Sequence, residues 1–157
     1  MQIKDTIPRA VALTIAAGLA TIVAISAPRR AAADNDGRGR GCSESTLRGD
    51  YAFAIDGQIL AGPKAGLLRG VAMTHFDGDG GLSQVDFTTI NGVPIGTDWR
   101  PGTGSYEINA DCTGKAQINF TDGSPALHLR LVVADRGDQV RTIVEGNATG
   151  SFGTRVR

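Results

Sequence analysis

The chain is poor in aromatic residues, histidine and cysteine, and each shortage narrows the possible functions. Aromatic residues make up 5% of the 157 residues, and there are two histidines and two cysteines. A metal site needs several thiol or imidazole ligands at close spacing, so we expect no metal. The sequence also lacks a Gly-x-Ser-x-Gly motif, a His-Glu-x-x-His motif and a Walker-type phosphate loop. We therefore expect no cofactor, assign no catalytic residue and favour a role other than catalysis.

The first 33 residues differ from the rest of the chain and predict a secretion signal. Lys4 and Arg9 precede an uncharged, apolar run from Ala10 to Ala27. Small residues follow at positions 31–33, so we expect a signal helix cleaved after Ala33 and a secreted or periplasmic product. The apolar run is also long enough to cross a bilayer core of about 30 Å, which leaves an uncleaved membrane anchor as the alternative. Only that alternative would bring the protein to a membrane.

Charge gives no reason to expect a nucleic-acid partner. The chain holds 16 basic and 16 acidic residues, and cleavage after Ala33 would remove four basic residues and one acidic residue. The mature chain would be slightly acidic, whereas nucleic-acid binding depends on neutralising phosphates. The basic residues in 37–40 are too few to reverse this. We interpret residues 34–46, which are polar and rich in glycine at their start, as a flexible N-terminal segment.

Cys42 and Cys112 predict one disulfide in an exported chain. The bond would close a long loop, for which the chain-entropy model gives about 4 kcal/mol of stabilisation as an upper figure. An intermolecular bridge and a metal pair are the competing interpretations.

Residues 47–157 alternate between apolar and polar positions with a period of two, and no long stretch has a helical period. All but one of the 22 glycines lie after residue 33, where they suit turns and curved strands. The expected strands are 47–56, 67–76, 82–90, 93–99, 103–110, 115–121, 126–134 and 139–145, with residues 148–157 as a closing segment. Short strands separated by turn residues indicate a sandwich or a barrel. We favour an all-β domain over 47–157, a single antiparallel up-and-down β-barrel of about eight strands, because closure hides every strand edge.

Residues 42–157 resemble a group of small secreted bacterial proteins whose domain is similar to the allene oxide cyclase barrel, a relative of lipocalin-type (calycin-like) barrels. The matching segments are Cys42, Leu47–Phe53, Phe76–Leu82, Gly102–Gly114, and Leu131–Asp135 leading into residues 139–144. The resemblance implies the barrel and the disulfide, and it carries no active-site residue. By analogy with the plant cyclases, it implies an apolar ligand and a homo-oligomer.

The interior of such a barrel is the expected ligand site. Seven apolar residues are predicted to line it: Tyr51, Phe53, Ile55, Phe87, Tyr106, Ile108 and Phe120. Our first hypothesis is that they hold a small apolar molecule. The second is a structural or interaction protein with a filled barrel, which would show a broad exposed apolar patch or form an oligomer. The third is an isomerase or cyclase, which would need a polar cluster inside the barrel.

Several single residues carry expectations of their own. We expect Trp99 to plug the barrel mouth, because large apolar residues usually find burial. Strand charges such as Asp86 and Glu107 are expected to point outward, because an isolated buried charge is costly. His75 and His128 are interpreted as surface residues, and Asp77–Gly81 as a hairpin turn and not a calcium loop, because position 88 is a threonine where such a loop needs glutamate.

Overall fold

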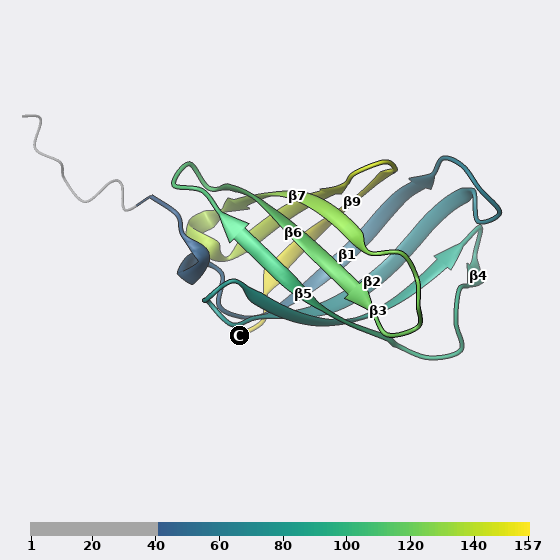
Figure 1. Cartoon of the computed structure of the whole chain (residues 1–157), viewed down its shortest axis with the longest axis horizontal. Coiled ribbons are helices and arrows are strands. Elements are labelled where there is room, and N and C mark those ends of the chain that lie inside the picture. The colour runs from purple at the N-terminus through teal and green to yellow at the C-terminus, as the bar shows by residue number, and fades with distance from the viewer. Residues whose placement is uncertain (1–40) are drawn as a thin grey trace, which may run out of the picture. The chain divides into compact units, whose positions relative to one another are not determined.

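The computed structural model describes residues 41–157, which form a closed antiparallel β-barrel (Figure 1). Eight strands form the barrel: β1 (Gly49–Ile59), β2 (Gly66–Phe76), β3 (Gly81–Ile90), β5 (Arg100–Ile108), β6 (Thr113–Phe120), β7 (Leu127–Ala134), β8 (Gln139–Val144) and β9 (Ala148–Arg155). A two-residue strand, β4 (Val93–Pro94), pairs with β3. Two short 3-10 turns complete the described part, η1 (Glu44–Thr46) and η2 (Asp135–Gly137). The expected signal helix and its cleavage site lie outside the described residues.

The barrel closes because β1 pairs on both of its sides. It pairs with β2 from Gly49 to Ile59 and with β9 from Tyr51 to Gln58, and all other neighbours in the ring are also antiparallel. The chain passes around the ring in sequence order, with β4 as an addition at one edge. The predicted all-β, up-and-down barrel of about eight strands is therefore confirmed. The strand expected at residues 93–99 is wrong, because only Val93–Pro94 pair there, and the eighth barrel strand is β9 in the expected closing segment. No helix in residues 41–157 has the length and hydropathy of a membrane span.

Local sequence explains where the strands and turns lie. In β7, Leu129, Leu131 and Val133 face inward and are at least partly buried, while Arg130 and Val132 between them are exposed. A hairpin turn is predicted at residues 91–92, and both residues there take positive φ values, 51° for Asn91 and 81° for Gly92. Pro94 follows in the two-residue edge strand, as expected for a residue without a backbone N–H.

One end of the barrel, which we call the closed end, is filled by aromatic rings under the N-terminal segment. The ring of Phe76 lies between those of Tyr51 and Tyr106, with edge-to-face centroid distances of 5.2 and 5.0 Å. Leu47 is fully buried with this group. Figure 1 shows η1 at this end and β4 at the opposite, open end. Aromatic side chains therefore fill the core at the closed end.

The two tyrosine hydroxyls tie the closed end to four separate segments. The Tyr51 hydroxyl donates to the carbonyl of Gly137 and accepts from Arg155, 2.8 Å from its Nη2. The Tyr106 hydroxyl accepts from the Gly78 amide at 3.0 Å and lies 3.0 Å from the Leu47 carbonyl oxygen, to which it donates. Burial raises the pKa of both hydroxyls above the ordinary value of 10.0.

Cys42 and Cys112 form a disulfide within the chain, with their Cα atoms 4.9 Å apart. Cys42 precedes η1, and Cys112 lies in the turn between β5 and β6. The bond therefore joins the N-terminal segment to the closed end of the barrel, beside the hydrogen bond from the Cys42 amide to the Ala110 carbonyl.

Replacing both cysteines by serine is expected to lower the free energy of unfolding by roughly 2–5 kcal/mol, because the unfolded chain regains the freedom that the cross-link removes. Urea unfolding of the variant and the parent, compared at one temperature, measures the difference. Parent protein treated with a reductant should give the same loss. Equal unfolding midpoints for all three samples would contradict the structural role of the bond.

Stability is expected to fall as the pH rises above 10. The unfolded chain loses its tyrosine protons near pH 10, whereas the folded chain keeps them because burial raises the pKa of both tyrosines. Their contribution is therefore complete below pH 10 and is lost above it. Tyrosinate absorbance, to which only the chain's two tyrosines contribute, should appear together with the loss of the β-sheet circular dichroism signal. Ionisation of either tyrosine near pH 10 with the fold intact would contradict this account.

Candidate functional site

The barrel interior holds a cavity of about 70 Å³. Inward residues of seven strands surround it, among them Phe53, Ala72, Ile118, Leu129 and Val140. Ligand pockets usually measure about 300–1,000 Å³, and an engineered cavity that binds benzene measures about 150 Å³. The interior therefore has room for only a few atoms.

The seven residues predicted to line a ligand site lie in four different surroundings. Phe53 and Ile55 line the small cavity. Tyr51, Tyr106 and Ile108 are buried, and both tyrosines belong to the aromatic cluster at the closed end. Phe120 is buried under the guanidinium group of Arg100. The structure therefore brings six of the seven residues into the core, but only two of them to the cavity.

Phe87, the seventh, does not line the interior. It lies on the outer face of β3, and its ring stands 6.1 Å from that of Trp99. Apolar residues in this strand occupy both alternating positions, and the inward set contains Gln84, Asp86 and Thr88. The expected plug is also wrong, because Trp99 is 51% exposed and packs against Phe87 on the outside.

Asp86 contradicts the expectation that strand charges point outward. Its side chain is 2% exposed and faces Arg100, the residue directly opposite on β5. The Arg100 Nε and Nη2 atoms lie 3.0 and 2.9 Å from the two carboxylate oxygens, which makes the pair bidentate. The guanidinium carbon also lies 3.6 Å from the centre of the Phe120 ring. Pairing removes most of the cost of burying the carboxylate.

The ion pair continues into a short chain of hydrogen bonds. The Gln84 amide donates to Asp86 at 3.2 Å, and the Thr74 hydroxyl donates to the Gln84 carbonyl oxygen at 3.2 Å. A separate pair, Thr142 and Ser151, shares a hydrogen bond of 2.7 Å across the cavity wall. Every buried side-chain N or O atom in residues 41–157 has a partner. These inward polar groups are therefore satisfied by one another.

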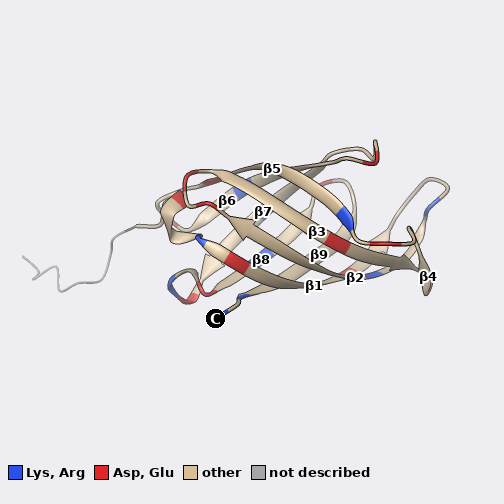
Figure 2. Ribbon diagram, turned by 90° about the horizontal axis from the view of Figure 1, so that it is seen from below, with Lys and Arg blue, Asp and Glu red and all other residues tan. Residues whose placement is uncertain are grey.

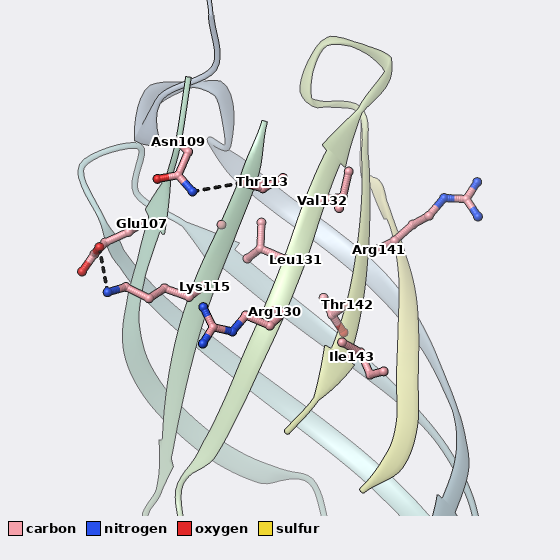
Figure 3. Close-up of a pocket in the computed structure, with 11 residues that line it drawn as sticks. Glu107, Asn109, Thr113, Lys115, Arg130, Leu131, Val132, Arg141, Thr142 and Ile143 are labelled. Atoms are coloured by element: carbon pink, nitrogen blue, oxygen red, sulfur yellow. Dashed lines mark hydrogen bonds and ion pairs between the residues drawn. The ribbon is translucent and has the colours of Figure 1, made fainter. Parts of the chain in front are cut away.

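A second hollow of about 600 Å³ lies on the outer face of β5 to β8 (Figure 3). Three cations border it, and each already has an interaction. Lys115 lies 3.0 Å from Glu107, Arg130 pairs with Glu145, and Arg141 lies 5.0 Å from the centre of the Phe152 ring. Figure 3 shows Arg141 extending away from the other labelled side chains. The groove thus has neither an unpaired charge cluster nor a deep enclosure.

The outer faces of β1, β2, β3 and β9 form a continuous apolar surface, which we call the apolar wall. It consists of Ala52, Ala54, Val71, Met73, Val85, Phe87 and Phe152. The cross-strand register places these residues in two adjacent rows. One row is Phe152, Ala54, Val71 and Phe87, and the other is Thr154, Ala52, Met73 and Val85, in which only the threonine is polar. Val71 is 49% exposed, and Met73 and Phe152 are each 40% exposed.

Two polar side-chain pairs, an Asp–His pair and an Asp–Arg ion pair, bound the apolar wall at the two ends of its strands. Toward the closed end, Asp50 and His75 face each other across β1 and β2, with Oδ1 and Nδ1 2.7 Å apart. Toward the open end, Asp56 and Arg69 face each other at 4.0 Å. Figure 2 shows long stretches of β1 and β2 without a charged residue. An apolar surface with a polar rim is typical of a protein interaction site.

Comparison with known protein families, curated proteins and solved structures finds no match for this chain. In residues 41–157, no group of three or more histidine, cysteine or acidic side chains is placed to hold a metal ion. His75 and His128 are both exposed, as expected. The candidate site is therefore the apolar wall, which the sequence analysis anticipated as a feature of one hypothesis but did not locate. The sequence did not reveal the apolar wall, because two of its residues are alanines and because Phe87 was predicted to face inward.

Replacing Arg100 by methionine is expected to lower the free energy of unfolding by roughly 3–5 kcal/mol, because it leaves the buried Asp86 carboxylate without its partner. The double variant Asp86→Leu with Arg100→Met should recover most of this loss, since it removes both charges. Urea unfolding of the three proteins measures the effect. If the single variant were as stable as the parent, the pair would not lie inside the barrel.

Proposed function

We propose that this chain is an exported interaction protein that binds a protein partner through the apolar wall. The single observation that supports this proposal is a cluster of seven apolar residues on four neighbouring strands, of which six are exposed and Phe87 is partly buried. Soluble monomers seldom expose large contiguous apolar surfaces without a function for them. Export is supported by the disulfide, since such bonds persist mainly in oxidising compartments.

The filled interior favours this role over ligand storage. A cavity of about 70 Å³ is too small for a lipid-like molecule without movement of the lining side chains. The polar groups that could serve an isomerase are hydrogen-bonded to each other, with both Asp86 oxygens held by Arg100. A ligand-binding barrel and the resemblance to allene oxide cyclase stay predictions from the sequence.

The closed barrel also suits the presentation of a fixed surface. The four strands of the apolar wall, β1, β2, β3 and β9, each pair with neighbours on both sides, so none of them offers a free edge to a partner. The disulfide and the tyrosine hydrogen bonds hold the closed end in place. Binding at the wall would then require little ordering of the backbone, which favours affinity.

A charged residue placed in the apolar wall is expected to weaken the binding of apolar probes severalfold. Anilinonaphthalene sulfonate reports exposed apolar surface, and Trp99 can transfer excitation to dye bound nearby because it packs against Phe87 at the wall's edge. Val71→Asp should reduce the transfer from this single tryptophan severalfold. The matched control is Gln117→Asp, which adds the same charge to an exposed position on β6, four places around the ring from β1.

The control should bind the dye as the parent does, and circular dichroism should show both variants folded. Equal dye binding by Val71→Asp and the parent would reject the wall as a binding surface.

A further inference from the structure

We infer that the partner of the apolar wall is a second copy of this chain, docked wall to wall about a two-fold axis parallel to the strands. This inference rests on the proposed function of the wall and adds the partner and its orientation. It follows from the positions of Asp50, Asp56, Arg69 and His75 and from the order of small and large residues across the wall.

In this orientation, the charged residues of one copy face residues of opposite charge on the other copy. Asp50 and Asp56 lie on β1, and their cross-strand partners His75 and Arg69 lie on β2. A two-fold axis that runs between β1 and β2, in the plane of contact, places β1 of each copy over β2 of the other. Asp56 of one copy then faces Arg69 of the other, and Asp50 faces His75. Two ion pairs at the open end become a set of four alternating charges.

The other simple orientation brings like charges together. An axis perpendicular to the strands would place Asp50 over Asp56 and His75 over Arg69. Facing carboxylates repel, and such like-charge contacts suppress wrong docking modes. The arrangement of charges at the two ends of the wall therefore selects the axis parallel to the strands.

Side-chain size is complementary in the same orientation. The row Phe152, Ala54, Val71, Phe87 would meet its own reverse, so Ala54 faces Val71 and Phe152 faces Phe87. Small residues also lie on β1 at the middle of the curved wall, with the phenylalanines on the flanking strands. Large flanking side chains fill the gap that opens between two convex surfaces, so the two walls fit despite their curvature.

The size of the wall sets the strength of the dimer. Four strands about 4.8 Å apart, and the length from Asp50 to Asp56 at about 3.3 Å per residue, give roughly 400 Å² of projected surface per copy. A standard stable interface buries about 800 Å² per partner. The wall is therefore smaller than a standard stable interface and is suited to a weak, reversible dimer.

The charged residues can be exchanged without loss of the fold. The side chains of Asp56 and Arg69 are 74% and 69% exposed, and their atoms are 4.0 Å apart within one chain. Exposed pairs of this kind add little to stability. Asp56→Arg and Arg69→Asp should therefore fold as the parent does, and Gln117→Arg is the matched control on β6.

Sedimentation velocity of the purified full chain over a range of micromolar concentrations tests the inference. The parent and Gln117→Arg should shift reversibly from one to two chain masses as concentration rises. Asp56→Arg alone and Arg69→Asp alone should dimerise at least tenfold more weakly, because like charges then face each other. An equimolar mixture of the two variants should dimerise again, since each residue at the open end regains an opposite charge.

Two results would overturn the inference. One is a parent that stays monomeric at all concentrations; the other is a parent dimer that Asp56→Arg leaves unchanged or strengthens. In either case, loss of dye binding in Val71→Asp would still support the wall as a binding surface for another partner. Equal dye binding by that variant and the parent would reject the proposed function as well.

Discussion

The pairing of β1 with β9 is the constraint on which the rest of the structure depends. It turns a sheet with two free edges into a ring, so every strand residue must face either a packed interior or the solvent. Because side chains alternate along a strand, one residue of each neighbouring pair faces the barrel interior and the other faces the outside. The filled core and the apolar wall are therefore two consequences of the same closure. The two strands pack closely, since a Cβ atom at Gly153 on β9 would clash with the Phe53 ring on β1.

The barrel has polar groups in its interior and apolar residues on part of its outer surface. Inside, the carboxylate of Asp86, the guanidinium of Arg100 and the amide of Gln84 occupy positions that an apolar core would fill. Outside, valine, methionine and phenylalanine occupy solvent-facing positions, where polar residues are more usual. The buried pair fixes the facing of β3, because a shift of one residue would expose the pair and bury Phe87. That facing is also what places Phe87 and Val85 on the apolar wall.

Much of the fold could be predicted from the sequence, because strong alternation and turn residues identify strands without knowledge of their neighbours. The leucines of β7 and the turn at Asn91 are examples, and the disulfide followed from the cysteine count. The facing of β3 could not be predicted, since apolar residues occur at both alternating positions and only the opposite residue, Arg100, decides which set is inside. The predicted burial of Trp99 was wrong for a related reason. Trp99 packs against Phe87, which was itself predicted to face inward and faces outward. The apolar wall could be predicted only from the strand register, which places Phe152 beside Ala54 although nearly a hundred residues separate them in the sequence.

The most direct test of this account is nuclear magnetic resonance of the pairing between β1 and β9. We expect nuclear Overhauser contacts between Ala54 and both of its cross-strand neighbours, Phe152 and Val71, together with slow amide exchange along β1 and β9. The Phe53 ring should give contacts to Gly153 and none to Phe152, because the two faces of β1 are separated by the barrel wall. Absence of the contacts between Ala54 and Phe152, with rapid amide exchange on the facing edges of β1 and β9, would contradict the closed barrel.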